Sequence, residues 1–212
     1  MKRIVDVIGA IGGLVVFALP MALIAVVILL ADGPPVLFRQ ERLGRRRRPF
    51  TILKFRSMRN GEVTGVGRML RATGLDELPQ FINILRGELS AVGPRPLTQA
   101  DVERLGWSAP EFDFRWTMRP GLAGLAQIVG ARSARQSLHL DRRYIADPRL
   151  ALDLRLIALS FAITALGKRR ARRLLIRRSA RIGATGASAT TASVSARRTT
   201  LAGAPGSRLT HP

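Results

Sequence analysis

The sequence predicts a small α/β-type domain, rich in helix and poor in sheet, built on an N-terminal apolar helix and carrying further amphipathic helices at the membrane interface. Three observations support this fold class. Residues 4–31 are almost uninterruptedly apolar, residues 32–167 alternate short periodic segments with glycine and proline, and residues 168–212 are rich in Arg, Ser, Thr and Ala. We therefore expect a membrane helix at 1–31, one compact domain at 32–167 and a basic, low-complexity tail at 168–212. The tail lacks the apolar pattern of a folded segment and is expected to be disordered.

The first segment, residues 4–31, would reach roughly 40 Å as one straight helix, which is long enough to cross a bilayer. A cleaved signal peptide is disfavoured because this apolar core is too long. A membrane-spanning anchor would place Lys2 and Arg3 on one side and the arginines after residue 38 on the other, against the positive-inside tendency. Pro20 suggests a third interpretation, because a proline inside a helix kinks it. A re-entrant helix would leave the membrane on the face where it entered. The residues alone leave the last two interpretations open.

The middle of the chain predicts short elements. We expect the "GPP" motif at residues 33–35 to end the first helix and residues 36–44 and 50–58 to form strands around a basic turn. This turn, residues 45–48, would either touch lipid headgroups or be solvated. Further expectations are a helix over 101–114 broken near Pro110, a glycine-rich loop with a short strand over 115–132, and helices over 137–147 and 148–166. The last helix has apolar residues at helical spacing, namely Leu150, Leu154, Ile157, Ala158 and Phe161.

Charge and composition limit the function classes. The chain has 35 Lys and Arg against 14 Asp and Glu, a formal net charge of +21. Such a balance favours an anionic partner: nucleic acid, an anionic lipid surface or a phosphorylated substrate. Cysteine is absent and only two histidines are present, which excludes disulfides, thiolate catalysis and zinc sites built from Cys or several His.

Two adjacent carboxylates, Asp76 and Glu77, precede an apolar helical face formed by Leu78, Phe81, Ile82 and Leu85. Proline is tolerated in the first helical turn, so Pro79 predicts a helix that begins near Asp76. One interpretation is structural. Thr73 and Asp76 have the spacing of a capping box, or Asp76 is itself the N-cap.

The other interpretation of the carboxylate pair is chemical. Arg68 and Arg71 precede it and Arg95 follows it. Carboxylates among arginines suit Mg2+ together with phosphate oxygens. An ionised aspartate near cations can also act as a nucleophile toward phosphorus.

At this point four ordered blocks resemble a known family. They are "PPVLFRQERLG…PFTILKFRSM", "LRATGLDELPQFINILRGELSAVGPRP", "MRPGLAGLAQIVGAR" and "LDRRYIADPRLALDLRLI". In this order they resemble the bacterial sugar transferases, the monotopic polyprenyl-phosphate phosphoglycosyl transferases. The resemblance extends from the apolar segment to about residue 166. It implies transfer of a phospho-sugar from a UDP-sugar to undecaprenyl phosphate with release of UMP, at the start of exopolysaccharide, capsule or lipopolysaccharide assembly.

The resemblance also implies roles for individual residues. Asp76 matches the nucleophile that forms a covalent phosphosugar intermediate, and Glu77 matches a neighbour that assists in acid/base chemistry or, with Asp76, holds Mg2+. Pro20 matches the break of a re-entrant helix. The expected substrate-binding residues are Arg71 and Arg95 on the diphosphate, together with Lys54, Arg119, Gln127, Asp141 and Tyr144.

Alternatives remain for several of these residues. Lys54 and Arg56 either face the site or point to solvent from a strand. Asp141 and Tyr144 either line the sugar or uridine pocket or lie on a helix surface beside arginines.

The resemblance further implies a place and partners for the protein. We expect the cytoplasmic face of the bacterial inner membrane, an anionic lipid surface and no nucleic-acid partner, with a homodimer among the assemblies left open. The rival hypothesis is a basic, membrane-tethered nucleic-acid-binding or adaptor protein without catalysis. Aromatic residues make up only 5% of the chain, which disfavours stacking on bases. An adaptor role leaves the Asp-Glu pair unexplained.

Four features depart from the family pattern. The linker "RNGEVTGVGRML" at residues 59–70 is shorter than is usual between the two blocks. Leu19 precedes Pro20 where serine is frequent, Ala123 replaces a usual threonine, and the segment "VGAR" at residues 129–132 replaces Asn-Gly-Arg. These departures concern sugar preference and efficiency more than reaction class.

Overall fold

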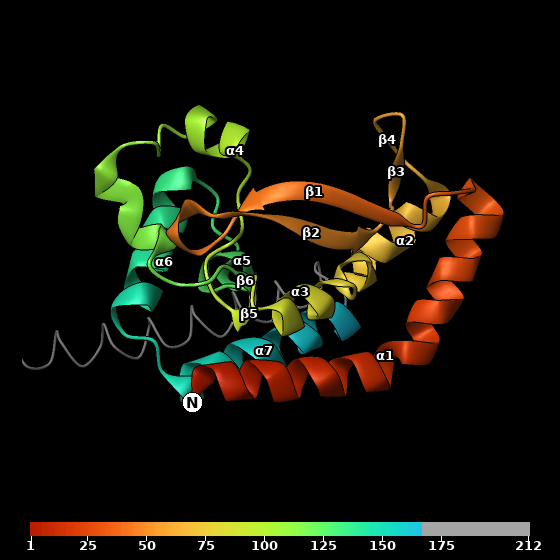
Figure 1. Cartoon of the computed structure of the whole chain (residues 1–212), viewed down its shortest axis with the longest axis horizontal. Coiled ribbons are helices and arrows are strands. Elements are labelled where there is room, and N and C mark those ends of the chain that lie inside the picture. The colour runs from red at the N-terminus through yellow and green to blue at the C-terminus, as the bar shows by residue number, and fades with distance from the viewer. Residues whose placement is uncertain (167–212) are drawn as a thin grey trace, which may run out of the picture. The chain divides into compact units, whose positions relative to one another are not determined.

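The computed structural model describes residues 1–166, with side chains up to residue 163, and this part of the chain is rich in helix (Figure 1). The sheet in it is limited to three two-stranded pairs. The expected helix-rich class with little sheet is thereby confirmed. The predicted tail at 168–212 lies outside the described residues.

The elements follow the chain in this order. The helices are α1 (Lys2–Asp32), α2 (Gly65–Thr73), α3 (Gln80–Arg86), α4 (Gln99–Arg104), α5 (Leu125–Val129), α6 (Ala134–Ala146) and α7 (Leu150–Leu166), and the 3-10 turns are η1 (Arg45–Arg47), η2 (Leu75–Glu77) and η3 (Pro110–Trp116). The strands are β1 (Leu37–Leu43), β2 (Pro49–Phe55), β3 (Met58–Arg59), β4 (Glu62–Val63), β5 (Ser90–Val92) and β6 (Gly121–Ala123).

The first helix, α1, contains Pro20 and changes direction about midway along its length (Figure 1). A proline inside a helix removes one backbone hydrogen bond, which accounts for such a bend. Gly33 ends the helix with a φ of 72°, and its N–H donates to the carbonyl of Leu29 at 3.1 Å. The predicted stop at residues 33–35 is therefore confirmed. Among the described helices, α1 has the length and apolar composition to cross a membrane.

Both halves of α1 pack on the same core. Ala10 comes from the half before Pro20 and Ile24 and Ile28 from the half after it, and all three are buried in one cluster with side chains of β2 and α3. Much of the remaining apolar surface of the helix is nevertheless exposed. Its exposed apolar side chains are Ile4, Ile8, Ile11, Val15, Val16, Leu19, Leu23, Val26, Val27, Leu29 and Leu30.

The predicted strands form an antiparallel hairpin, in which Leu37 lies opposite Phe55 and Leu43 opposite Pro49. This confirms the two strands and the basic turn between them, although the second strand ends at residue 55, three residues earlier than expected. Burial does not alternate strictly along β2: Phe50, Ile52 and Phe55 are buried in the cluster that contains α1, and Leu53 is buried as well.

The basic turn packs against η3 and is not merely solvated. Arg45 donates from Nε to the carbonyl of Thr117 at 2.9 Å. Arg47 forms an ion pair of 2.7 Å with Asp113, and its guanidinium carbon lies 3.9 Å from the centre of the Trp116 ring. The interpretation of this turn as a freely solvated one is therefore wrong for these two arginines.

The short strands β5 and β6 pair in parallel, with Ser90 opposite Gly121. Gly93 follows β5 and lies so close to the backbone at Gly121 that a Cβ on either glycine would collide with the other segment. Glycine is required here because two backbones meet. The pairing brings the loop that carries Arg95 beside the loop that carries Arg119, and it confirms the short strand expected within 115–132.

The helix expected to begin near Asp76 begins later, at Gln80, after the 3-10 turn η2. The N-cap positions of η2 and α3 are Gly74 and Pro79, so Asp76 occupies neither. Thr73 ends α2 instead, and its hydroxyl donates back to the carbonyl of Met69 at 2.9 Å. The capping interpretation of Thr73 and Asp76 is therefore wrong.

The segment after β5 contains less helix than expected. The predicted helix over 101–114 is divided into α4, which ends at Arg104, and η3, which begins at Pro110. The break near Pro110 was expected, because proline cannot continue a helix beyond its first turn. Helix α5 had not been anticipated within the glycine-rich passage.

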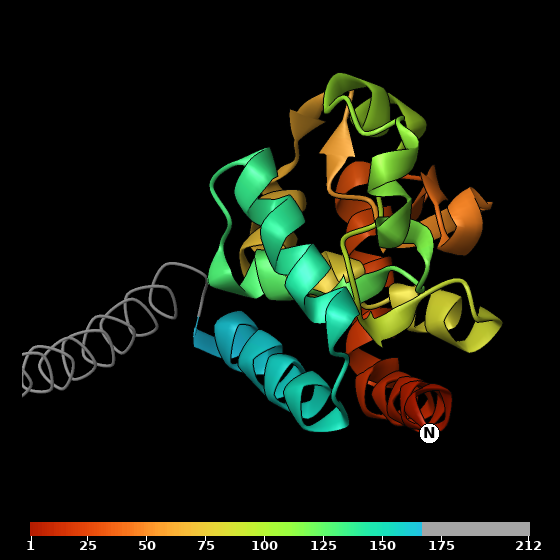
Figure 2. The same ribbon diagram turned by 90° about the vertical axis from the view of Figure 1, so that its left-hand side faces the viewer.

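The last two helices form as predicted, but the expected apolar face of α7 is mostly exposed. Figure 2 shows α6 and α7 as two separate helices, and in Figure 1 α7 lies beside α1 at the lower edge of the view. Leu154 and Phe161 are about half exposed, at 53% and 50%, whereas Asp153 and Leu156 are buried. Asp153 is buried although it is charged, because it forms an ion pair of 2.5 Å with Lys2 of α1.

Candidate functional site

The carboxylate pair lies on η2, between α2 and α3. Gly74 adopts the left-handed conformation, with a φ of 76°, and this conformation allows the chain to turn from α2 into η2. The side chain of Asp76 is buried, and Glu77 is half-buried. Glu77 accepts a hydrogen bond from the ammonium of Lys54 on β2 at 2.8 Å. An acid of η2 is thereby joined to the core hairpin.

Lys54 lies near the end of β2 and Arg56 just after it, and their side chains take different positions. Lys54 faces η2, as the interpretation of a site residue requires. Arg56 is buried and donates to the carbonyls of Asp32, Gly33 and Pro34. Its role is to hold the end of α1 on the domain, and the solvent-facing interpretation is wrong for it.

Arg71 lies on α2, close to its C-terminal end. Its Nε donates to the hydroxyl of Ser57 at 3.0 Å, and one of its terminal nitrogens lies 3.0 Å from the sulfur of Met58. Because η2 contacts both α2 and β2, four of the predicted residues come from adjoining elements. They are Lys54, Arg71, Asp76 and Glu77.

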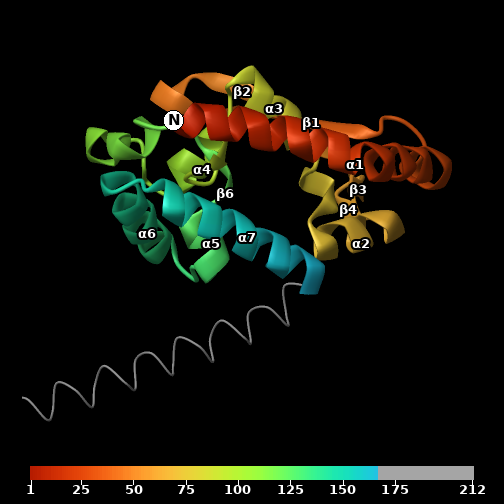
Figure 3. The same ribbon diagram turned by 90° about the horizontal axis from the view of Figure 1, so that it is seen from below.

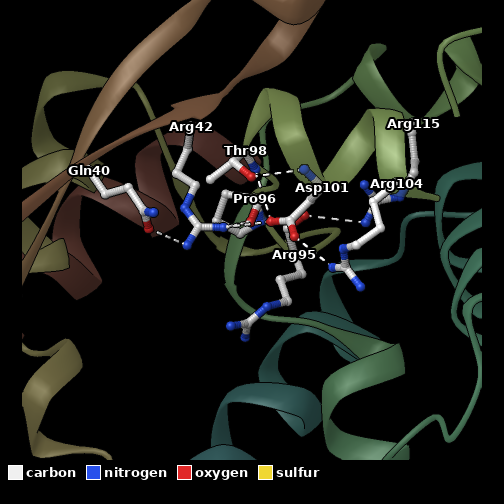
Figure 4. Close-up of polar contacts among 8 residues, drawn as sticks. All are labelled: Gln40, Arg42, Arg95, Pro96, Thr98, Asp101, Arg104 and Arg115. Atoms are coloured by element: carbon white, nitrogen blue, oxygen red, sulfur yellow. Dashed lines mark hydrogen bonds and ion pairs between the residues drawn. The ribbon is translucent and has the colours of Figure 1, made fainter. Parts of the chain in front are cut away.

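Arg95 follows β5 and belongs to a different polar cluster, which is shown in Figure 4. Its side chain is exposed, and its backbone carbonyl accepts a hydrogen bond from Arg115 at 3.2 Å. Arg42 of β1 is close enough to interact electrostatically with Arg95. Burial and the positive charge of Arg95 both lower the pKa of the Arg42 guanidinium, and Asp101 opposes this shift. Two arginines that repel each other at a surface favour an anion between them.

Asp101 holds this second cluster together. Its carboxylate accepts hydrogen bonds from Arg104 at 2.7 Å and from Arg42 at 3.3 Å, and it forms a capping box with Thr98 at the start of α4. Burial acts against ionisation, but the bonds from Arg104 and Thr98 and the charge of Arg42 hold the pKa of the Asp101 carboxyl below its usual value. No local pattern in the sequence singles out Arg42, which is one of several arginines around the basic turn.

Arg119 lies at the opposite end of α3 from the carboxylate pair. Its Nε donates at 2.7 Å to the carbonyl of Gly87, the residue that ends α3. Asp76 precedes the start of the same helix. The seven residues of α3 separate the two positions by about 10 Å along the helix axis.

Two further predicted residues, Asp141 and Tyr144, lie in the interior. Asp141 is buried in an ion pair of 2.8 Å with Arg115. Burial raises the pKa of its carboxyl, and the charge and hydrogen bond of Arg115 oppose that shift. Tyr144 is buried and donates to Asp153 at 2.5 Å, which together with burial raises the pKa of its hydroxyl well above the usual range. The alternative of an exposed pair on a helix surface is wrong for Asp141 and Tyr144.

Gln127 lies on α5 and is half-buried. Its Oε1 atom is buried and accepts no hydrogen bond from the described residues. A donor group on a ligand could satisfy such an acceptor. The substrate-binding role of Gln127 stays a prediction.

The acid groups of η2 fit a magnesium ion that is shared with a substrate. Among the described residues, no three side chains of His, Cys, Asp or Glu gather in one place. A closed protein cage for a metal is therefore not formed there. Magnesium, however, is usually held by one or two carboxylates and completed by substrate phosphates and water. Asp76 and Glu77 supply a donor set of that kind.

Comparison with known proteins places these residues in a family context. A family model described as bacterial sugar transferase matches residues 1–167. A UDP-glucose:undecaprenyl-phosphate glucose-1-phosphate transferase of Caulobacter vibrioides is 42% identical over 159 residues, which cover 68% of this chain and 60% of that protein. The enzyme of the same name from Escherichia coli is 35% identical over 181 residues, which cover 76% of this chain and 39% of that protein.

A further relative is closer to this chain in length. The exopolysaccharide production protein PSS of Rhizobium leguminosarum bv. phaseoli is 34% identical over 184 residues, and the match covers 74% of this chain and 91% of that protein. The first two relatives are matched over less than two thirds of their length.

Proposed function

Because this chain belongs to the bacterial sugar transferase family, we propose that it transfers a sugar 1-phosphate from a UDP-sugar to undecaprenyl phosphate. A reaction of this kind is named for the relatives from Caulobacter vibrioides and Escherichia coli. The observation that carries the proposal is the η2 turn, where buried Asp76 adjoins a glutamate that is held by Lys54.

The proposed chemistry uses Asp76 as a nucleophile. A carboxylate oxygen attacks the phosphorus that bears the sugar, and the bond from that phosphorus to the bridging oxygen breaks. UMP leaves with the bonding electron pair, and the sugar phosphate stays on Asp76 as a mixed anhydride. A phosphate oxygen of undecaprenyl phosphate then attacks the same phosphorus and displaces the carboxylate. The products are UMP and undecaprenyl diphospho-sugar, and Asp76 is regenerated.

The cations around η2 suit a diphosphate. Arg71 comes from α2 and Lys54 from β2, and both elements contact η2. Guanidinium groups match phosphate oxygens in geometry and charge. Glu77 is already oriented by Lys54, so it can accept a proton from an incoming group or share a metal ion. Mg2+ bound by Asp76 and Glu77 would neutralise charge on the diphosphate.

We also propose that α1 is re-entrant and keeps the domain at the cytoplasmic face of the inner membrane. Near its start, Asp6 accepts hydrogen bonds from Ser90 and Ala91 at 2.8 and 3.0 Å. At its end, the carbonyl of Asp32 accepts bonds from Arg56 and Arg59 at 2.9 Å each. Both ends of the helix are thus bonded to one compact unit. A straight path across the bilayer would pull one end away from it and leave buried polar groups without partners.

Turnover and the intermediate test the enzymatic proposal. Purified full-length protein in detergent is incubated with a panel of UDP-sugars, undecaprenyl phosphate and Mg2+, and UMP and the lipid product are measured. Without the acceptor, intact mass should increase by one sugar phosphate. Asp76→Asn should lose both signals but keep its helical circular dichroism. Turnover by this variant, or an adduct on it, would contradict the nucleophile role.

Accessibility to a thiol reagent tests the topology, because the chain has no cysteine of its own. Single cysteines are placed at Met1 and Glu41, on either side of α1. A membrane-impermeant reagent should label neither in intact cells and both after permeabilisation. Pro20→Leu restores a straight apolar helix and should make the cysteine at position 1 reactive from outside. Labelling of that position from outside without the Pro20 change would show a spanning helix.

A further inference from the structure

A cavity of about 200 Å3 lies beside the first turns of α1. Its wall contains side chains from α1, the basic turn, β5 and the segment before β6. The lining residues are Lys2, Arg3, Asp6, Arg45, Ser90, Thr117, Met118 and Arg119. The cavity is separate from the carboxylate pair, because Arg119 bonds to the C-terminal end of α3 and Asp76 precedes its N-terminal end.

The charge of this cavity is not balanced by the protein. Lys2 is paired with Asp153 at 2.5 Å and can be counted as neutral with it. Arg3, Arg45 and Arg119 then face one acid, Asp6, which leaves an excess of two positive charges. Both oxygens of Asp6 are engaged elsewhere, by the hydroxyl of Ser90 and the N–H of Ala91.

Two of these arginines have unused donors. Arg45 and Arg119 each bond through Nε, to the carbonyls of Thr117 and Gly87 at 2.9 and 2.7 Å. Among the described residues, nothing bonds to their terminal nitrogens. Arg3 differs, because its terminal nitrogens donate to the carbonyls of Ile84 and Leu85. Two guanidinium groups with free donor pairs in one cavity match the oxygens of a phosphate.

The surface around the cavity is apolar. Ile4 and Ile8 of α1 are 63% and 66% exposed, and Leu150 and Leu154 at the start of α7 are 39% and 53% exposed. The bond from Lys2 to Asp153 joins these two helices at the same end. Figure 3, seen from below, shows α1 and α7 together on the near face of the unit. A ligand with a phosphate and long apolar chains suits this combination.

We propose that the cavity binds the phosphodiester headgroup of an anionic phospholipid, with the acyl chains along the exposed apolar side chains of α1 and α7. The cavity volume is many times the roughly 10–15 Å3 that a cavity needs to hold one water, so it can hold a phosphate with its ester groups. The bound headgroup would fix the depth of both helices at the interface. This inference rests on the proposed membrane location and is independent of the transfer chemistry.

Lipid retention by the full-length protein provides the test. The protein is purified in a neutral detergent and exposed to equal amounts of phosphatidylglycerol and phosphatidylcholine with identical acyl chains. Native mass spectrometry then counts the lipids that stay bound. We expect one tightly held phosphatidylglycerol. Arg45→Gln should weaken it about tenfold, which corresponds to roughly 1.4 kcal/mol for a lost charge-assisted contact. The combined change Arg45→Gln and Arg119→Gln should remove it.

Arg48→Gln is the matched control, since Arg48 belongs to the same turn, carries the same charge and is exposed outside the cavity. It should retain phosphatidylglycerol as the unmodified protein does. Equal retention by Arg45→Gln and Arg48→Gln, or no preference over phosphatidylcholine, overturns the proposal. If these arginines bind inorganic phosphate but do not bind phosphatidylglycerol, the proposal that the bound phosphate belongs to a lipid is overturned.

The outcome separates this inference from the proposed enzymatic function. A protein that retains phosphatidylglycerol but does not release UMP contradicts the transferase proposal alone. A protein that turns over without any preference for phosphatidylglycerol contradicts the lipid site alone.

Discussion

Replacing Arg115 by methionine should lower the stability of the folded domain more than any surface substitution, because it leaves a buried carboxylate without its ionic partner. Arg115 and Asp141 have only 4% and 3% of their side chains exposed, and their charged groups are 2.8 Å apart. The guanidinium also lies 5.0 Å from the centre of the Trp107 ring and donates to the carbonyl of Arg95. Methionine keeps much of the volume but leaves Asp141 without its partner.

The expected cost follows from this burial. Removing one partner of a buried ion pair costs about 3–5 kcal/mol, out of a total stability of about 5–15 kcal/mol. For a domain of this size, each kcal/mol shifts the unfolding midpoint by about 2–4 °C. We therefore expect Arg115→Met to lower Tm by about 6–20 °C, as measured by circular dichroism of the full-length protein in detergent.

The loss should also depend on pH. Burial raises the pKa of Asp141 even beside Arg115, and without that charge the pKa must rise further. The folded state of the variant then binds a proton more tightly than the unfolded state, so its stability is greatest below the ordinary carboxyl pKa of 3.8. Stability falls as the pH rises from there through the raised pKa. The difference in Tm between the variant and the unmodified protein should therefore be smaller in acid than at neutral pH.

A double variant supplies the control for this reasoning. Changing Arg115 to methionine and Asp141 to leucine together removes the pair and leaves no buried charge at this position. Replacing a buried ion pair by apolar residues is often close to neutral, so the double variant should be more stable than Arg115→Met alone. If the double variant is the less stable of the two, or if the loss in Arg115→Met is independent of pH, the argument from the stranded carboxylate is refuted.

Three further changes test other parts of the protein. Arg95→Ala should lower kcat/KM for the UDP-sugar, with a loss of transition-state stabilisation of roughly 2 kcal/mol or more, because a diphosphate would lose a charge-assisted partner. Unchanged kinetics would show that Arg95 does not belong to the site. Gly67→Ala should destabilise the domain by about 1–3 kcal/mol, because the new Cβ would collide with the backbone of Ser57, and an unchanged Tm would show that α2 can shift. Tyr144→Phe should lower the stability by about 1–3 kcal/mol through loss of the hydrogen bond to Asp153, which a thermal melt without any shift would contradict.

Local patterns in the sequence predicted elements well where the physical signal is local. The two strand-like segments 36–44 and 50–58 and the basic turn between them predicted the β1–β2 hairpin, and the motif at residues 33–35 predicted the end of α1. The start of α3 was misplaced because Pro79 is compatible with either a first helical turn or the end of a 3-10 turn. The glycine at position 74, which allows the left-handed turn, was the signal that could have separated the two.

Side-chain orientation on α7 was predicted less well, for a physical reason. Helical spacing correctly indicated a helix with Leu150, Leu154 and Phe161 on an apolar stripe, but it did not indicate which residues of the helix face the domain. In the structure these side chains are exposed and Asp153 is buried, because it pairs with Lys2 of α1. A pattern within 148–166 could not indicate this partner, which lies 151 positions earlier in the chain. Periodicity reports an apolar stripe but does not say whether protein or lipid covers it. The exposed leucines of α7 and the exposed face of α1 therefore belong to one surface that no single segment reveals.

For the candidate site, the sequence by itself determined the family blocks, the Asp76–Glu77 pair and the arginines around it, because those signals are adjacent in the chain. Tertiary structure alone decided which of them share a place. Lys54 meets Glu77 because β2 packs against η2, while Arg119 lies at the far end of α3 and Asp141 is committed to Arg115 in the interior. The reason is that contacts between segments far apart in sequence depend on how whole elements pack. The charge of a residue does not by itself indicate which partner it will meet in the folded protein.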